Sequence, residues 1–372
     1  VERSRGLGDV YKRQHFCGQR RRYMTHTVNT NEFLRARTRR WVGIFGALVV
    51  LMLVAAVLSI VLGQYYVPLQ DLGSILLGKD HHSGLASSVV WDIRLPRILL
   101  GFLVGACLGV AGTLMQAVFA NPLAEPSIIG VTSGAGVGAA LAIVFNLAFF
   151  GTFTVPFFAF LSALVAAGLI YQLARSQGRV VVINLVLTGI AVNAVCGAII
   201  SFMVYLAPTA SREEIIFWQM GSLNGAQWKH VWAVLPITMV GIAVALRMGG
   251  ALDVLALGEK AAGHTGINVS QLRAIVIIAA TVLTAGAVAF AGLIGFVGLI
   301  IPHLLRTVMG PENYLLIPAS ALGGAVLIGL ADVAARTLIE FADLPIGIFT
   351  ALVGGPTFFV LLRRMMRKGI HA

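Results

Sequence analysis

The chain has 372 residues, of which 58% are hydrophobic and only 11% are charged, and its mean hydropathy is +0.90. Soluble domains carry about 25% charged residues, so this composition excludes an ordinary soluble fold. The net charge is +12, but the basic residues lie in the N-terminal tail, in short connections and after the last apolar stretch, without a patch interleaved with aromatic residues. We therefore expect no nucleic-acid partner and a protein surrounded by membrane lipid.

The N-terminal part of the chain is polar and basic. We expect residues 1–23 to be a non-native or disordered leader and residues 24–41 to be a basic cytoplasmic N-terminus. The apolar run that begins at Trp41 extends past 20 residues without a clear small-residue cleavage site, so it predicts a first membrane span and not a signal peptide. The transmembrane domain is expected over 42–363 and a cytoplasmic tail over 364–372.

Apolar stretches of roughly 20 residues recur along the chain, which is the length a helix needs to cross about 30 Å of hydrocarbon. They predict an all-α integral membrane protein with about ten transmembrane helices. Glycines at 292, 295 and 298 interrupt one continuous apolar run and predict a turn or a broken helix there. The expected spans are 42–63, 98–119, 127–150, 153–173, 183–206, 230–248, 274–293, 294–309, 314–338 and 345–362.

The positive charges are unevenly distributed between the two sides that these spans define. With ten spans, 21 of the 27 Lys and Arg residues fall on the side of the N-terminus and six on the other. Because cytoplasmic loops carry the excess of Lys and Arg, both termini of this multi-pass protein are expected in the cytoplasm.

Two pairs of glycines have the spacing that lets membrane helices approach closely. These are Gly105 with Gly109 and Gly134 with Gly138, each separated by three residues inside an expected span. The second pair belongs to a GxGxG run, which no strand precedes, so we interpret it as helix packing and not as nucleotide binding.

We expect no chemistry on this chain. The segment GSILLGKD from Gly73 matches GxxxxGK, but Asp80 stands where a P-loop needs Ser or Thr for Mg²⁺. Cys107 and Cys196 lie inside apolar stretches without a CxxC motif or neighbouring His residues, so neither a disulfide nor a metal site is expected. The chain is therefore interpreted as a non-enzyme without catalytic residues or a cofactor of its own.

A few polar groups fall in or near the spans. Asp332, Arg336 and Glu340 recur every four residues, which places them on one helix face, either as an ion-paired structural or docking group or as a proton relay. Asn184 and Asn193 in the fifth span either line a pathway or form hydrogen bonds between helices.

Five blocks of sequence resemble one family of membrane proteins. They are WDIRLPRILLGFLVGACLGVAGTLMQAVFANPLAEPSIIGVTSGAGVG from Trp91, FWQMGSL from Phe217, ALGEKAAGHTGI from Ala256, GFVGLIIPHLLR from Gly295 and ADVAARTLIEFADLPIGIFTALVGGPTFFVLL from Ala331. In this order they resemble the FecCD-type permeases of ABC importers for iron siderophores, haem and cobalamin. The resemblance covers the chain from about Trp41 to Arg367 and implies a bacterial plasma (inner) membrane as its location.

The resemblance implies the assembly and the mechanism. It implies a type II ABC importer permease bundle that works with a second permease copy or a paralogue, two cytoplasmic ABC ATPase subunits and an extracytoplasmic substrate-binding protein. ATP and Mg²⁺ would bind on the ATPase, and alternating access would move an iron chelate inward. The expected cargo is a ferric siderophore, with haem and cobalamin as alternatives. An ion-coupled secondary transporter, with Asp332 and Glu340 as coupling groups, is the alternative of another class.

Arg94, Arg97 and Arg336 match family arginines that resemble docking sites for acidic residues of the binding protein. A guanidinium pairs bidentately with a carboxylate and stays charged at physiological pH, which suits such a role. The alternative for Arg94 and Arg97 is that they anchor the second span at the membrane interface.

The cytoplasmic segment at about 250–272 resembles the family's coupling helix, which fits a groove on each ATPase. Gly258, Glu259, Ala262 and Gly266 match that pattern, and a short helix with Ala and Gly on its contact face would fit a partner groove. Thr265 departs from the Leu usual in the family.

The resemblance also implies that the fifth and tenth spans flank the translocation pathway. Asn193, Thr350, Gly354 and Gly355 are the expected lining residues.

Overall fold

The computed structural model describes residues 30–76, 85–176, 179–339 and 343–369. The chain divides into two units, residues 1–43 and 44–372. In the first unit, which contains the start of α2 (Thr30–Val61), the Arg37 guanidinium lies 4.6 Å from the centre of the Trp41 ring. The second unit contains the rest of α2 and all other described helices.

Ten apolar helices account for the ten expected spans within the described residues, so that prediction is confirmed. Seven are long enough to cross a membrane: α2, a continuous helical segment Leu85–Val118 that ends in α5 (Leu95–Val118), α7 (Thr154–Leu173), α8 (Val182–Leu206), α10 (Trp228–Leu255), α12 (Val269–Ala291) and α14 (Asn313–Thr337). Three have shorter apolar stretches: α6 (Val131–Val144), α13 (Val297–Met309) and α15 (Ile346–Gly369), whose apolar part is Ile346–Val360.

Several short elements connect the spans. Sequence periodicity does not predict them, because each is too short to show a repeat. They are α3 (Leu69–Leu76), α4 (Leu85–Ser88), η1 (Val89–Arg94), η2 (Pro126–Ile129), η3 (Gly151–Phe153), α9 (Thr209–Met220), α11 (Glu259–His264) and the strands β1 (Arg175–Ser176) and β2 (Arg179–Val180). The two strands pair antiparallel, with Ser176 opposite Arg179.

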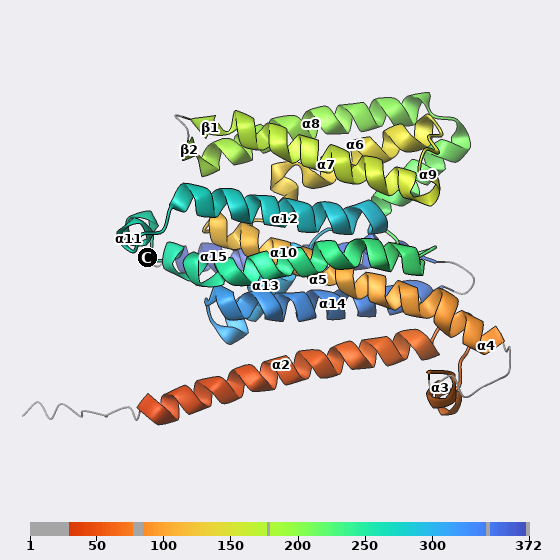
Figure 1. The fold of residues 1–372 in the computed structure, drawn as a ribbon, viewed down its shortest axis with the longest axis horizontal. Coiled ribbons are helices and arrows are strands. Elements are labelled where there is room, and N and C mark those ends of the chain that lie inside the picture. Colours follow the sequence, from red (N-terminus) through yellow and green to blue (C-terminus); the bar gives the residue numbers. More distant parts are fainter. Residues whose placement is uncertain (1–29, 77–84, 177–178, 340–342, 370–372) are drawn as a thin grey trace, which may run out of the picture. The chain divides into compact units, whose positions relative to one another are not determined.

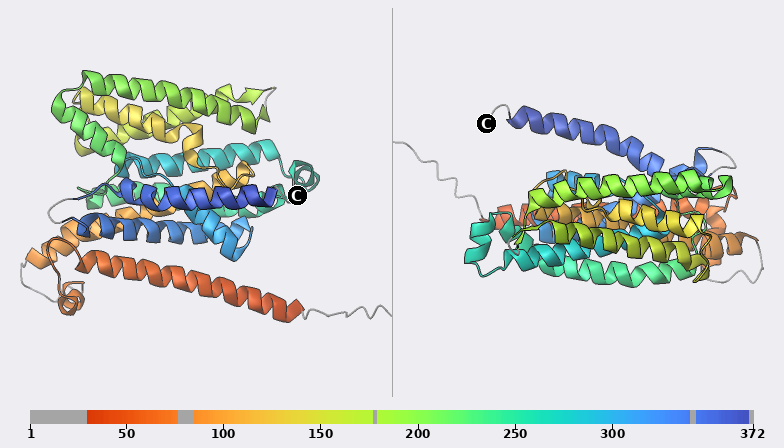
Figure 2. Two further views of the ribbon diagram at one scale, coloured as in Figure 1. Left: turned by 180° about the vertical axis from the view of Figure 1, so that it is seen from behind. Right: turned by 90° about the horizontal axis from the view of Figure 1, so that it is seen from above.

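The helix α5 is the centre of the second unit. It packs against α14, α12, α10 and α13 (Figure 1). The helices α6, α7 and α8 form a second group, which stays together in both views of Figure 2 and contacts the first group through α12. The loop with α11 and the segment with α3 and α4 lie at opposite ends of the helices (Figures 1 and 2).

The predicted glycine spacing brings helix backbones into contact. A Cβ atom at Gly105 of α5 would overlap the carbonyl of Gly324 in α14, and one at Gly138 of α6 would overlap the carbonyl of Phe158 in α7. Glycine is therefore required at both positions, since any side chain would push the helices apart. The packing interpretation of the GxGxG run is confirmed.

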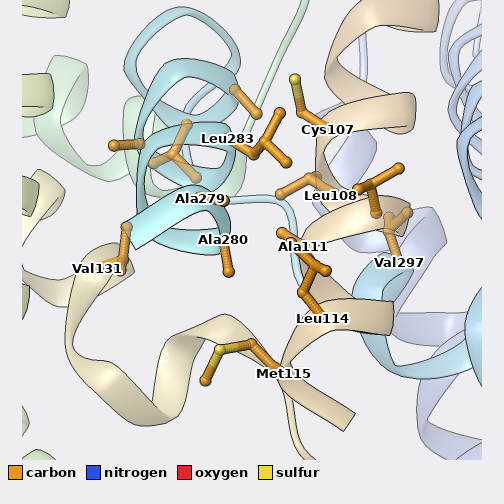
Figure 3. Close-up of a cluster of buried hydrophobic side chains, with 14 of the residues drawn as sticks. Cys107, Leu108, Ala111, Leu114, Met115, Val131, Ala279, Ala280, Leu283 and Val297 are labelled. Atoms are coloured by element: carbon orange, nitrogen blue, oxygen red, sulfur yellow. The ribbon is translucent and has the colours of Figure 1, made fainter. Parts of the chain in front are cut away.

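Side chains of α5 and α12 form the middle of the core. Figure 3 shows Ala111 and Leu114 of α5 on the side of Ala280 and Leu283 of α12, and Leu108 beside Val297 of α13. Cys107 is buried beside Thr238 of α10, with 3.1 Å between Sγ and Oγ1. Small residues alternate with leucines, so the helices interdigitate at close range.

The second span begins earlier than predicted. Its start at residue 98 is wrong, because the helical segment already begins at Leu85. Pro96 has no N–H for the carbonyl one turn before it, and the chain forms the wider π-helical turn η1 immediately ahead of this residue. Arg94 and Arg97 consequently lie within the helix and not in a connecting loop.

The predicted break between the seventh and eighth spans is confirmed. The helix α12 ends at Ala291, and Gly292 has a φ of +69°. Phe296, which precedes α13, also has a positive φ, +68°, a conformation that costs energy for a bulky side chain. Packing around Phe296 must therefore hold this turn.

Candidate functional site

Three arginines and two aspartates form a buried cluster at the α3 and α4 end of the helices. Arg97 of α5 binds Asp332 of α14, with 2.9 Å between Nε and Oδ1, and Asp343, with 3.1 Å between Nη1 and Oδ2. The other carboxylate oxygen of Asp332 lies 3.1 Å from Nε of Arg336. We call Arg94, Arg97, Asp332, Arg336 and Asp343 the arginine cluster.

Two of these arginines hold the end of α2. Arg94 donates hydrogen bonds to the carbonyls of Ile60 and Tyr65. Arg336 donates to Oγ of Ser59 at 2.6 Å and to its carbonyl at 3.2 Å. Because the last carbonyls of a helix have no partner within it, the two guanidinium groups satisfy this helix end and favour its dipole.

The exposure of these arginines differs from the expectation. Arg94, Arg97 and Arg336 are 4%, 6% and 8% exposed, whereas the sequence places them in external segments as contacts for a partner. Burial is possible because each guanidinium has carbonyl or carboxylate partners. In this structure Arg94 binds carbonyls at the end of α2, and Arg97 binds Asp332 and Asp343.

The spacing of Asp332 and Arg336 correctly predicts an ion pair on one face of α14. Glu340, the third residue of that series, lies outside the described residues. Both carboxylate oxygens of Asp332 accept hydrogen bonds from arginines, so neither oxygen lacks a partner.

The connection between α10 and α12 lies at the opposite end. We call residues 256–268 the α11 loop. Helix α10 continues to Leu255, beyond its expected end, because Gly249, Leu252 and Leu255 prolong its buried face. Gly258 before α11 and Gly266 after it have φ values of +114° and +82°, so both turns depend on glycine.

The α11 loop is fixed to the bundle by one face and exposed on the other. Ala262 is completely buried, which corrects its expected position on the contact face. Glu259 pairs with Arg273 of α12, with 2.6 Å between Oε1 and Nη2. Leu257, in contrast, is 78% exposed, and Gly258 and Gly263 are exposed too. These residues are the surface that a partner could contact.

A recess of about 320 Å³ lies beside this surface. Glu259 and Gly263 of the loop, Asn268 and Arg273 at the start of α12, and Val180 of β2 line it. Its walls thus come from the connection between α10 and α12 and from the connection between α7 and α8. The expected topology places both connections on the cytoplasmic side.

The residues expected to line a pathway have local partners. Asn193 of α8 accepts a hydrogen bond from Oγ of Ser133 and donates one to the carbonyl of Ser127, 3.2 Å away. These hydrogen bonds join α8 to α6 and η2, as one of the two interpretations of Asn193 predicts.

In α15, Thr350 is buried and donates to the carbonyl of Gly347 at 3.1 Å. A Cβ atom at Gly354 would overlap the ring of Phe296, whereas one at Gly355 would meet nothing within 4 Å. Gly354 is thus a packing position and Gly355 borders open space.

Sequence reasoning missed several partners in these sites. Asp343 pairs with Arg97, and Arg273 pairs with Glu259. Phe296, which contacts Gly354, is not indicated by the sequence either. The carboxylate of Asp253 accepts the backbone N–H of Asn313 and caps α14. No sequence signal at these positions indicates the pairing, since the partners lie far apart along the chain.

Within the described residues, no group of three or more His, Cys, Asp or Glu residues could hold a metal ion.

Comparison with known proteins identifies the family. Residues 51–364 match the FecCD transport family. The Cobalamin import system permease protein BtuC of Halobacterium salinarum is 44% identical over 75% of this chain and 74% of its own length. The Hemin transport system permease protein HmuU of Yersinia pestis is 35% identical over 75% of this chain and 85% of its own.

A solved structure, described as an inward-facing conformation of a metal-chelate type ABC transporter, has the same fold. Its TM-score is 0.76 at 33% identity, and the alignment covers 86% of this chain and 98% of that one. With the ten apolar helices, these matches show that the chain belongs to the FecCD transport family, as a membrane-spanning permease of the ABC importer type.

Proposed function

We propose that this chain is the translocating subunit of an ATP-driven importer, which moves a metal chelate into the cytoplasm by alternating access. Two separate ATPase subunits bind ATP and Mg²⁺, a second copy or a paralogue of the chain completes the pathway, and an extracytoplasmic protein delivers the cargo. Both termini face the cytoplasm in this proposal. Membership of the FecCD family supports this assembly.

The observation that carries the proposal is the form of the α11 loop. A short helix with one exposed side joins α10 to α12, and a buried alanine and an ion pair to Arg273 fix its other side. A force applied to its exposed surface would therefore reach two long spans directly. We propose that the ATPase binds here, on Leu257, Gly258 and Gly263, and that Glu259, Ala262 and Gly266 keep the loop in shape.

The cargo belongs to one chemical class, a metal ion held by an organic chelator. The relatives are named for cobalamin and hemin, and the similar structure is described as a metal-chelate transporter. We place cobalamin and haem before the ferric siderophore that the family resemblance suggests, because the names of these relatives refer to the first two cargoes.

We propose that the binding protein docks over the arginine cluster. The cluster has three guanidinium groups and two carboxylates, which leaves one positive charge in excess and favours an acidic partner. Because the side chains of Arg94, Arg97 and Arg336 are buried, they would not touch the binding protein directly. They would attract it through their excess positive charge and would position the surface on which it docks.

We propose that α8 and α15 border the pathway at the contact with the second permease. Both helices expose large apolar side chains, such as Leu187 and Phe359, and Gly355 borders open space. Asn193, Thr350 and Gly354 would shape this wall through the contacts that position their helices.

The test compares ion-pair variants in vesicles that contain the permease, its ATPase and its binding protein. Glu259→Arg places two positive groups together, and ATP-driven uptake should be lost while the permease stays folded. The double variant Glu259→Arg with Arg273→Glu restores the pair in reverse, and uptake should return. It is the matched control, because it carries the same substitution at position 259.

Uptake of cobalamin, hemin and a ferric hydroxamate siderophore in the same vesicles identifies the cargo. Uptake that persists without the ATPase, and that neither variant changes, would overturn the proposal in favour of ion-coupled transport. The held carboxylate of Asp332 argues against that alternative, since a coupling group must release its partners to exchange protons.

A further inference from the structure

An apolar groove of about 430 Å³ lies between α7, α10 and α12. Its walls carry five phenylalanines and one small residue, Ala233 of α10, which leaves the space open. The phenylalanines are Phe150, Phe153, Phe157, Phe160 and Phe290. We call it the phenylalanine groove. It lies toward the end of the helices that holds the arginine cluster. Ala233 is near the start of α10, and Trp228 at this start donates to the carbonyl of Trp91 in η1, 2.9 Å away.

The walls of the groove are braced by ring contacts. The centroids of Phe150 and Phe157 lie 4.9 Å apart, and Phe153 meets Phe290 edge to face at 6.2 Å. Pairs of this geometry stabilise one another beyond their buried area, so the groove is formed before a ligand arrives. All three helices are membrane spans, and an occupant must therefore be soluble in the hydrocarbon of the bilayer.

A lysine lies at the end of this apolar surface. Lys229, Ala233 and Ile237 follow at intervals of four on α10 and thus share one face, and Ala233 and Ile237 line the groove. Lys229 is exposed, and its Nζ lies 5.9 Å from the centre of the Phe153 ring. The groove therefore begins at a positive charge and continues as hydrocarbon surface.

Two tryptophans indicate the depth of this lysine in the membrane. Trp228 and Trp232 stack with 6.4 Å between ring centroids, and Trp232 is 63% exposed. Exposed tryptophans at the ends of membrane helices lie at the level of the lipid headgroups. From Lys229 to Ile237 the helix rises about 12 Å, which approaches the hydrocarbon thickness of one leaflet, about 15 Å.

We propose that the phenylalanine groove holds an acyl chain of an anionic glycerophospholipid, and that Lys229 binds the headgroup of the same lipid. A neutral apolar molecule would use the rings but not the lysine. A membrane helix of a partner protein rarely carries an acidic residue that could pair with Lys229. An anionic lipid satisfies both features at the observed spacing. This site is independent of the cargo and of ATP coupling.

The experiment is native mass spectrometry of the purified full chain, titrated with phosphatidylglycerol or with phosphatidylcholine of identical acyl chains. The wild type should retain phosphatidylglycerol about fivefold more strongly, the preference that one lysine near an anionic headgroup gives. Lys229→Gln should abolish the preference. Arg247→Gln, which removes a positive charge from the exposed far end of the same helix, should keep it.

A second variant tests the groove itself without changing charge. Ala233→Leu fills the space between the rings and should lower the retention of both lipids, with thermal unfolding measured to establish that the variant is folded. A preference that survives Lys229→Gln, or retention that Ala233→Leu leaves unchanged, would overturn the site. Equal retention of the two lipids by the wild type would also overturn it and would indicate ordinary annular lipid.

Discussion

Arg97 and Asp332 form a 2.9 Å ion pair although 235 positions separate them in the sequence. The pair belongs to a chain of alternating charges, from Arg336 through Asp332 and Arg97 to Asp343, which ties α5 to α14 and to the segment before α15. Arg336 extends the connection to the end of α2. This end of the bundle is therefore held by polar contacts where the rest is held by small apolar residues.

The two aspartates of the cluster should differ in their effect on stability. The side chain of Asp332 is 3% exposed and serves two arginines, whereas that of Asp343 is 24% exposed and serves one. Removing one partner of a buried pair costs about 3 to 5 kcal/mol, and exposed pairs contribute about 1 kcal/mol or less. Asp332→Asn should thus lower the thermal midpoint of the purified permease clearly more than Asp343→Asn. Equal midpoints would contradict the central role of Asp332.

Close packing of α5 on α14 gives a second prediction. In Gly105→Ala the new methyl group overlaps the backbone of Gly324, which cannot move aside as a side chain could. Overpacking of this kind costs about 1 to 3 kcal/mol. Gly168→Ala is the matched control, because Gly168 lies inside α7 and an added Cβ meets nothing within 4 Å there. It should be neutral or stabilising by up to about 1 kcal/mol. The reverse order of the two midpoints would be incompatible with this contact.

The helices themselves could be predicted because their signals are local. Apolar length, the GxxxG pairs and the glycines around Gly295 each act within a few turns, and the structure has a helix or a break where they indicate one. Long apolar segments have few alternatives in a membrane, since their backbone groups must be satisfied within the segment.

The burial of the arginine side chains could not be predicted in the same way. Arg94 and Arg97 look like loop residues in sequence because charge normally ends a span. Their burial depends on carbonyls at Ile60 and Tyr65 and on a carboxylate at Asp332, which only the tertiary structure brings together. Ala262 shows the same limit, because six residues of α11 are too few to indicate which side faces inward.

The shape of the α11 loop should depend on Gly258 through its backbone conformation alone. Its φ is +114° and an added Cβ would meet nothing within 4 Å, so Gly258→Ala introduces strain without a collision. Because ψ is +154°, the residue lies in a region that glycine adopts almost alone, and a residue with a side chain loses about 1 to 3 kcal/mol there. Hydrogen exchange of the amides at 256–268 should accelerate in this variant. Gly263→Ala has the same open surroundings and no positive φ, and its exchange should not accelerate. Equal exchange in both variants would show that the conformation of Gly258 does not maintain the loop.

Two adjacent glycines of α15 can separate packing from transport. Gly354 touches the ring of Phe296, whereas Gly355 borders open space. Gly354→Ala should displace Phe296, whose positive φ already requires support, and should lower both the thermal midpoint and ATP-driven uptake. Gly355→Leu should change the midpoint less, since Gly355 is half-buried and an added Cβ meets no atom within 4 Å.

Uptake by Gly355→Leu then tests whether this face of α15 lies on the pathway. In the proposed arrangement the leucine projects toward the cargo or the second permease, so uptake should fall while folding is preserved. ATPase activity distinguishes the two causes: hydrolysis that continues without uptake indicates an obstructed path, and loss of both indicates a disturbed contact between the permeases. Full uptake with a folded protein would exclude Gly355 from the pathway and direct attention to the exposed face of α8.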